Sequence, residues 1–246
     1  MASAAESGRA RQAMTTRRDD PRLTTLPGRL YRIVSSRFPP VGIWDRIADP
    51  ADFDTLSELE GMTNSRIREE MGALQSIPKD RRIAGAGTTP IMAAFTHWSP
   101  EPTRFSDGTF GVFYAGRSQT TAIRETVFHR ERFLAATRQP PQQLTVRCYI
   151  TRLRPRCKLH DVRTAHTELH DPDPANYPRS AVFARGLREA NANGIAYRSV
   201  RHEGGECAAV FWPDCLEPCV QGQHFAYHWD GAAITSVVRL VSVPLE

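Results

Sequence analysis

The sequence predicts an α+β fold, because strand-like and helix-like patterns alternate along the chain. Residues 144–150 alternate apolar and polar side chains, as a half-buried strand does. Residues 225–229 and 234–240 are also strand-like, and Asp230-Gly231 between them predicts a closing β-hairpin. Residues 111–129 pass from a strand pattern into a helical one. We therefore expect strands and helices within one mixed fold.

Composition indicates one folded domain with a loose N-terminal end. The chain has 246 residues, 40% hydrophobic and 24% charged, which is enough to bury one core. Residues 1–27 are basic and nearly free of large apolar side chains, so we predict a disordered tail there and a folded domain over 28–246. A basic arm for nucleic acid or a protein partner is the alternative for the tail. The net charge of +5 allows an anionic ligand but is too small to indicate a nucleic-acid-binding protein.

The first predicted strand contains a single charge, Arg32, among the apolar residues 30–34. A guanidinium in a strand must reach solvent, a carboxylate or a phosphate. A structural salt bridge, with Glu125 as one candidate partner, and an anion-binding role both remain open from the residues alone.

The next elements are assigned from periodicity. Residues 50–74 repeat apolar side chains at helical spacing and predict two short helices with a break, whose carboxylates suit a solvated face. Residues 82–87 carry glycines without the spacing of a phosphate-binding loop, so we expect a loop or an edge strand. The apolar run 91–95 is expected to form a strand, and 158–162 a shorter one.

The strand–helix unit over residues 111–129 carries the strongest chemical signal. Gly116 and Ser118 provide a turn and a helix N-cap between the two elements. Tyr114 lies at the end of the strand, and Glu125 follows eleven positions later in the second turn of the helix. The phenol and the carboxylate are therefore expected to face one cleft.

The C-terminal half adds a helix and two strands. Ser180 is expected to cap a helix that runs to about residue 190, and strands are expected around 194–201 and 206–211. Ser199 lies at a strand end, where a hydroxyl bonded to the backbone is the ordinary interpretation. No GxSxG motif supports a nucleophilic serine, so we expect Ser199 to hold a ligand.

Cysteine and histidine usage predicts no metal site. The five cysteines include no CxxC pair and are odd in number, which favours reduced thiols in a cytoplasm. The polar loop 163–178 contains His166, His170, Asp171 and Asp173 without a known ligand spacing, and we assign it no function. The sequence shows neither an apolar stretch of the ~20 residues that a membrane helix needs nor a signal peptide. We expect a cytoplasmic protein.

Four separated motifs over residues 29–240 resemble the RES domain family, named for its Arg, Glu and Ser. In this comparison Arg32 takes the place of the family's Arg, the Tyr114–Glu125 unit matches the central signature, and Ser199 takes the place of the family's Ser. Arg104-Phe105-Ser106 is similar to the family's Gly-Arg-aromatic-Asn segment, although Thr103 replaces the usual Gly and Ser106 the usual Asn.

The resemblance implies an ADP-ribosyltransferase-like fold, with mostly antiparallel β-sheets forming an NAD cleft. It also implies the toxin of a bacterial toxin–antitoxin system that cleaves NAD, as substrate, at the nicotinamide–ribose bond. An NAD glycohydrolase or phosphorylase would deplete cellular NAD and arrest growth. A mono-ADP-ribosyltransferase toxin that modifies a cellular protein is the alternative. A nucleic-acid-binding or nuclease toxin fits less well, because the sequence shows no basic surface interleaved with aromatics and no metal-binding carboxylates.

The residues then take roles that the resemblance implies. Glu125 would stabilise the developing positive charge of the ribose, with Tyr114 stacking on nicotinamide or ribose and Ser199 hydrogen-bonding the ligand. The arginines would bind the two phosphates, and these are Arg32, Arg104 and Arg201.

The resemblance also implies the partners. We expect a cognate antitoxin of the Xre or ParS type that covers the cleft and places an acidic group against the arginines. DNA would be contacted only through the antitoxin, and no membrane contact is expected. The sequence leaves the oligomeric state open, a homo-oligomer included.

Overall fold

The computed structural model describes residues 21–38, 42–46, 49–50, 69, 71–241 and 243. The described strands form one nine-stranded sheet in the order β1-β5-β6-β7-β3-β2-β4-β8-β9, and every neighbouring pair is antiparallel except β5 and β6. The strands are β1 Leu23–Thr24, β2 Leu30–Ser35, β3 Phe113–Gly116, β4 Gln142–Thr151, β5 Leu159–Asp161, β6 Gly194–Arg198, β7 Glu206–Val210, β8 Val220–Trp229 and β9 Ile234–Leu240.

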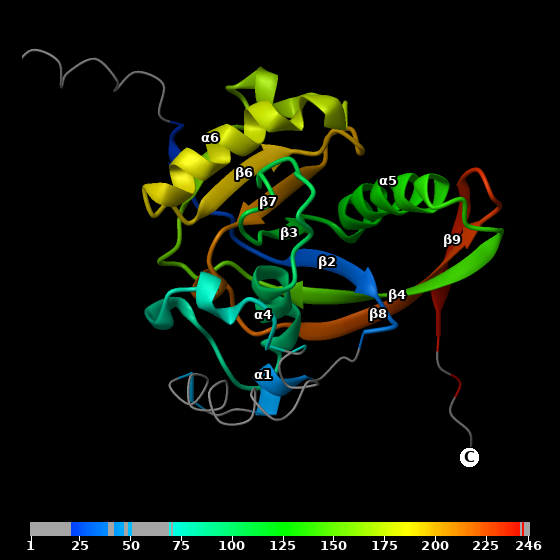
Figure 1. Cartoon of the computed structure of the whole chain (residues 1–246), viewed down its shortest axis with the longest axis horizontal. Helices are drawn as coiled ribbons and strands as arrows, with labels where there is room; N and C mark the ends of the chain where they lie inside the picture. Colours follow the sequence, from blue (N-terminus) through cyan, green and yellow to red (C-terminus); the bar gives the residue numbers. More distant parts are fainter. Residues whose placement is uncertain are drawn as a thin grey trace, which may run out of the picture.

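Four α-helices flank this sheet in the described part of the chain (Figure 1). They are α1 Ile43–Arg46, α4 Thr89–Thr96, α5 Gln119–Ala136 and α6 Tyr177–Glu189. Helix α6 lies against β6, α5 against β2 and β3, and α4 against β3. Short 3-10 helices occupy Leu74–Ser76, Lys79–Arg81, Thr167–His170, Pro174–Asn176 and Pro213–Cys215. The predicted α+β class with a mostly antiparallel sheet is confirmed, with one sheet in place of several.

Two hydrophobic clusters hold the layers together. The larger cluster packs β3, β6 and β7 against α4, and Phe113 and Phe211 are fully buried in it. The smaller cluster lies between β4, β8 and α5, and α5 contributes Ile123 and Val127 to it. The face of α5 next to this apolar stripe, which carries Glu125, lines a cavity.

The strand–helix unit forms where the sequence predicts it. Strand β3 ends at Gly116, and the hydroxyl of Ser118 accepts the backbone N–H of Thr121 at 3.1 Å. This N-cap satisfies one of the unpaired donors of the first helical turn. Helix α5 therefore starts at a fixed distance from β3, which sets the place of Glu125 relative to Tyr114.

The apolar run 91–95 is a helix, and the predicted strand is wrong. Pro90 lies in the first turn of α4, where its fixed φ favours the helix and no hydrogen bond is lost. Ile91, Met92 and Phe95 are all at most 3% exposed. A helix that is buried on almost every side has no polar face, so its sequence does not show the period of a surface helix.

The boundary of the N-terminal tail also needs correction. The predicted disordered tail includes residues 21–27, but β1 pairs with β5 there, through Leu23 opposite His160. Leu26 is 3% exposed and joins the larger core cluster. A two-residue strand between polar residues carries no detectable period, which explains the error. The remainder of the predicted tail, residues 1–20, lies outside the described residues.

Helix α6 begins three residues before its predicted cap. Ser180 lies in its first turn and donates its hydroxyl to the carbonyl of Tyr177 at 3.1 Å, instead of capping the helix. Pro178 supplies the start signal. The predicted helical segment over residues 50–74 falls mostly outside the described residues.

The remaining elements agree with the sequence. Strands β4 and β5 cover the two predicted strands at 144–150 and 158–162, and residues 82–87 form a loop. Strands β8 and β9 form the predicted hairpin. In its turn, the carboxylate of Asp230 accepts the N–H groups of Ala232 at 2.7 Å and Ala233 at 2.8 Å.

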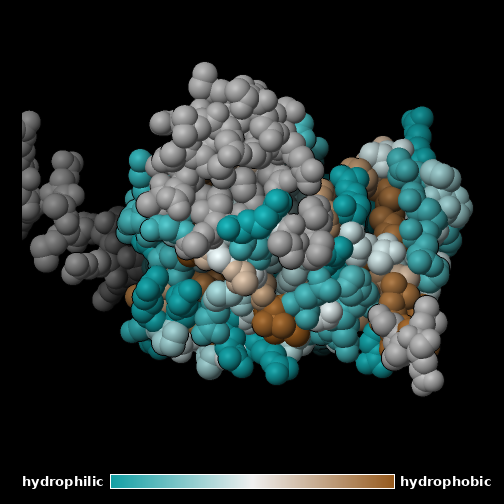
Figure 2. Space-filling model, turned by 90° about the horizontal axis from the view of Figure 1, so that it is seen from below, coloured by the Kyte–Doolittle hydropathy of each residue, from teal (hydrophilic) through white to brown (hydrophobic). Residues whose placement is uncertain are grey.

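Figure 2 shows one face of the surface. Where this face is formed by described residues, apolar surface occurs in separate patches between hydrophilic side chains. Scattered apolar residues of this kind are normal on a protein surface. Within the described residues, no helix has both the length and the apolar character needed to cross a membrane.

We expect alanine substitution at two glycines to change the free energy of unfolding in opposite directions. A Cβ on Gly111 would lie 2.2 Å from the carbonyl oxygen of Ala94 and 2.6 Å from the Cα of Phe95, so Gly111→Ala must push α4 away from the lead-in to β3. We expect it to lower the free energy of unfolding by about 1–3 kcal/mol. Gly186 lies inside α6 with nothing near its Cβ position, so Gly186→Ala should raise that free energy by about 0.5–1 kcal/mol. Urea unfolding of both variants measures the difference, and equal shifts would contradict the packing of α4.

Candidate functional site

A cavity of about 360 Å³ opens between α5 and the strands β2 and β3. Helix α5 forms one wall, β2 and β3 form the floor, and the segments around Arg104, Tyr177 and Tyr197 close one end. The cavity holds four of the six predicted site residues among its lining residues, and these are Arg32, Arg104, Tyr114 and Glu125.

The carboxylate of Glu125 is held by Ser199. The Ser199 hydroxyl donates to Glu125 Oε1 at 2.6 Å, across 74 residues of chain. The same hydroxyl oxygen accepts the backbone N–H groups of Arg201 at 3.1 Å and His202 at 3.0 Å. Because its proton points to a carboxylate and its lone pairs are occupied, Ser199 acts as a holder of Glu125. These two contacts with backbone N–H groups also agree with the alternative prediction that the Ser199 hydroxyl bonds to the backbone.

Tyr114 anchors the loop that forms the end of the cavity. Its hydroxyl oxygen accepts the N–H of Phe105 at 2.9 Å and lies 2.8 Å from the hydroxyl of Thr103. Burial raises the pKa of Tyr114 to about 12, so the phenol is neutral near pH 7. Tyr114 is therefore in no position to act as a base, and its contribution to the site is the ring and the loop that it holds.

Arg104 is a buried cation at the end of the cavity. It is 7% exposed, and its Nη1 donates to the carbonyls of Leu169 and Asp171, both at 2.9 Å. Its Nη2 donates to the hydroxyl of Tyr177 at 3.3 Å, and the guanidinium lies 4.6 Å from the centre of that ring. Among the described residues it forms no ion pair, so its positive charge is balanced only by dipoles.

Arg32 borders the cavity from β2, but its side chain points to the sheet face away from α5, because its neighbours Tyr31 and Ile33 pack toward α5. Its Nη1 donates to the carbonyl of Tyr114 at 3.1 Å, and its guanidinium lies 4.7 Å from the centre of the Phe113 ring. Burial lowers the pKa of Arg32 to about 10, which still leaves it charged near pH 7. The candidate salt bridge to Glu125 does not appear in the described part of the chain. The Arg32 guanidinium is directed toward Phe113 and not toward the Ser199–Glu125 pair.

Arg201 lies outside the cavity lining, contrary to the role expected for it. Its guanidinium lies 3.3 Å from the centre of the Phe128 ring. It donates to the carbonyl of Pro172 and, at 3.5 Å, to the hydroxyl of Tyr177. Arg201 therefore connects the outer side of α5 to the segment before α6.

Sequence reasoning missed the outer half of the α5 wall. His129, Arg130 and Phe133 line the cavity beyond Glu125. Desolvation, followed by the positive charge of four surrounding arginines, lowers the pKa of His129 to about 4. It is thus neutral near pH 7. The spacing of four and eight residues from Glu125 is the signal that would have placed His129 and Phe133 on the same helical face.

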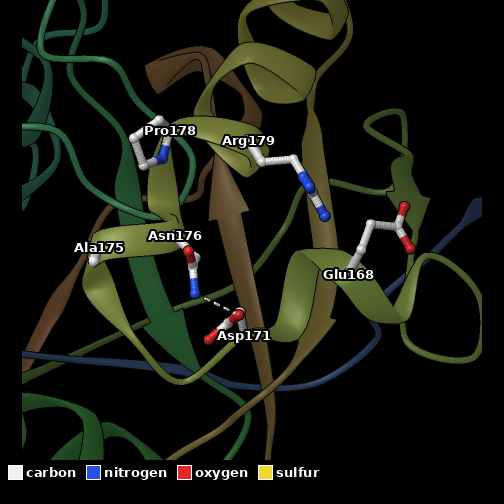
Figure 3. Close-up of a pocket in the computed structure, with 6 residues that line it drawn as sticks. All are labelled: Glu168, Asp171, Ala175, Asn176, Pro178 and Arg179. Carbon is white, nitrogen blue, oxygen red and sulfur yellow. Dashed lines mark hydrogen bonds between the residues drawn. The ribbon is translucent and has the colours of Figure 1, made fainter.

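A second, open pocket of about 380 Å³ lies at the start of α6 (Figure 3). Asn176 donates to the Asp171 carboxylate at 2.8 Å, and Arg179 extends toward the side on which Glu168 lies. The other oxygen of Asp171 accepts the N–H of Asp173 at 2.8 Å, so this carboxylate shapes the loop. No group of three metal-ligating side chains occurs among the described residues, and all five cysteines are free and buried.

Comparison with known proteins identifies one family and one relative. The family model described as RES domain matches residues 79–230. The uncharacterized protein y4oC of Sinorhizobium fredii is 28% identical over 205 residues, which cover 83% of this chain and 84% of that protein. The family model spans the candidate site residues from Arg104 to Ser199, whereas Arg32 precedes the segment that it covers.

Removal of the Tyr114 hydroxyl is expected to lower the free energy of unfolding measurably. Tyr114→Phe would leave the N–H of the fully buried Phe105 without its acceptor, at a cost of about 1–3 kcal/mol. Tyr31→Phe on the neighbouring strand is the matched control, because no hydrogen bond of the Tyr31 hydroxyl occurs in the described structure. We expect the control to change the free energy of unfolding by at most about 0.5 kcal/mol. Similar urea midpoints for the two variants would show that Tyr114 does not anchor the loop.

Proposed function

Because the chain belongs to the RES domain family, we propose that it is a toxin that consumes NAD by breaking the bond between nicotinamide and ribose. The family is associated with toxin–antitoxin systems and with NAD, which supports an enzyme in general terms. The specific reaction is our proposal. An ADP-ribosyltransferase-like arrangement of the sheet around the cavity is part of it.

One observation carries the proposal: the cavity is lined by a single, held carboxylate, and the other charged side chains among its lining residues are arginines. Glu125 is fixed by Ser199, while Arg32 and Arg104 border the same cavity without an ion pair in the described chain. Buried guanidinium groups without carboxylate partners favour an anionic ligand, and a pyrophosphate supplies two negative charges.

The chemistry follows from the charge that the reaction develops. Nicotinamide leaves NAD as a neutral base and leaves an oxocarbenium-like ribose. A fixed carboxylate beside the ribose stabilises that positive charge without having to reorganise. Ser199 holds Glu125 Oε1, and Oε2 has no hydrogen bond to the described chain, so Oε2 is available to the ribose. The same oxygen would orient the incoming acceptor.

The acceptor decides between the two reactions that share this site. Attack by water or phosphate gives an NAD glycohydrolase or phosphorylase and drains NAD. Attack by a protein side chain gives a mono-ADP-ribosyltransferase. The residues that stabilise the ribose are the same in both, so the distinction rests on what reaches the ribose carbon.

Loss of NAD that depends on Glu125 is the first expected outcome. Glu125→Gln keeps the size of the side chain but removes its charge, and we expect the rate of NAD loss to fall by about 10²-fold or more. Ser199→Ala should reduce the rate less, because it frees the carboxylate without removing it. Glu189→Gln, an exposed residue at the end of α6, is the control and should match the wild type.

The same assay separates the acceptors. Acceleration by added phosphate identifies phosphorolysis, and NAD loss only with a cell lysate, together with ADP-ribose mass on a protein, identifies the transferase. Absence of NAD loss under all conditions would refute the proposal and favour the nucleic-acid alternative.

RES domain proteins are generally toxins paired with an antitoxin. We propose an Xre- or ParS-type partner whose acidic C-terminal segment enters the cavity, where it would neutralise the unpaired arginines. Purified product of the adjacent gene is expected to suppress NAD loss when added in equimolar amounts, and removal of its C-terminal segment should abolish the suppression. If the truncated partner inhibits as well as the intact one, the cavity is not where it acts.

A further inference from the structure

One face of α5 extends the cavity wall well beyond Glu125. All cavity-lining residues of this helix are spaced three or four positions apart along two adjacent rows, and they are Ala122, Glu125, Thr126, His129, Arg130 and Phe133. Residues at this spacing share one side of a helix. Phe133 is eight residues beyond Glu125, which places it about 12 Å farther along the helix axis.

Phe133 is not part of the hydrophobic core. It is 57% exposed, while Ile123 and Val127 of the same helix pack against the smaller cluster. The fold therefore does not need this ring for its own packing. A flat apolar ring at the open end of a cavity is the type of surface on which a nucleobase stacks.

Arg130 lies between Glu125 and Phe133 along the wall. It has no hydrogen bond or ion pair to the described chain, and burial together with the neighbouring charge of Arg37 lowers its pKa. Two guanidinium groups near each other repel, and an anion between them relieves that repulsion. The wall thus presents a carboxylate, then a cation, then an aromatic ring.

Three other aromatic rings of the cavity pack against neighbouring side chains. Arg104 lies over the Tyr177 ring, and Tyr197 is 5% exposed with its ring packed 4.9 Å from that of Phe105. Tyr31 packs with the apolar residues between the sheet and α5. Phe133 is the one phenylalanine among the lining residues of the described wall, and it is 57% exposed.

We propose that the adenosine half of NAD lies along the outer half of α5, with a phosphate beside Arg130 and the adenine stacked on Phe133. This inference rests on the proposed function, because it takes NAD as the ligand of the cavity. The cavity volume of about 360 Å³ is near the lower end for ligand pockets, so a dinucleotide needs its whole length as far as Phe133.

The test compares ligands with and without the adenosine half. Phe133→Ala should raise KM for NAD by about 5- to 100-fold and leave kcat nearly unchanged, since stacking on a base is lost and the reacting bond is not touched. KM for nicotinamide mononucleotide, which has the same scissile bond without adenosine, should not change. Phe133→Tyr keeps the ring and should restore the affinity. Val182→Ala on α6 removes an apolar side chain that is also 57% exposed and serves as the control.

Calorimetric binding of ADP-ribose, which needs no turnover, separates this inference from the proposed function. If the wild type cleaves NAD but Phe133→Ala changes neither KM for NAD nor Kd for ADP-ribose, the adenine subsite is wrong and the proposed function stands. If NAD is not cleaved yet ADP-ribose binding weakens in Phe133→Ala and recovers in Phe133→Tyr, the subsite stands and the reaction is wrong. If ADP-ribose does not bind the wild type, the subsite is refuted whatever the NAD assay gives.

Discussion

The hydrogen bond between Ser199 and Glu125 is the interaction on which the site depends. It joins the turn after β6 to the second turn of α5, two elements that no strand pairing connects. A charge-assisted hydrogen bond of 2.6 Å is stronger than a neutral one, and it holds the carboxylate in one orientation. Because the Ser199 oxygen also accepts two backbone N–H groups, the turn and the carboxylate are positioned together.

The arginines around the cavity show how a positive site is kept stable without a ligand. Arg104 is bound by two carbonyls and a phenol, and Arg32 by one carbonyl and an aromatic ring. Dipoles and ring faces lower the cost of burying these charges, but they do not neutralise them. A carboxylate partner for each of these arginines would have cancelled their charge and removed the attraction of the cavity for an anion. The uncompensated charge of these arginines therefore lowers the stability of the fold at the place where an anion would bind.

The sequence was informative where structure is local. The Ser118 cap, the β3–α5 unit and the β8–β9 hairpin follow from residues within a few positions of each other, and all three form as predicted. Errors arose where the local pattern is ambiguous. A buried apolar run is compatible with either a strand or a buried helix. Residues 91–95 form part of helix α4, because Pro90 favours a helix start and the helix packs against β3. The two residues of β1 were missed because pairing with β5, far along the chain, is what orders them.

The sequence by itself determined that Tyr114 and Glu125 come from consecutive elements, and the family resemblance added Ser199 as a site residue. Tertiary structure decided what each of them contacts. Ser199 binds Glu125, Arg201 packs on Phe128 outside the cavity, and Phe133 is left exposed at its mouth. The physical reason is that a helix cap or a turn is made of neighbouring residues, whereas a side chain's partner across 74 residues depends on the order of the strands and on which face of each helix packs against them.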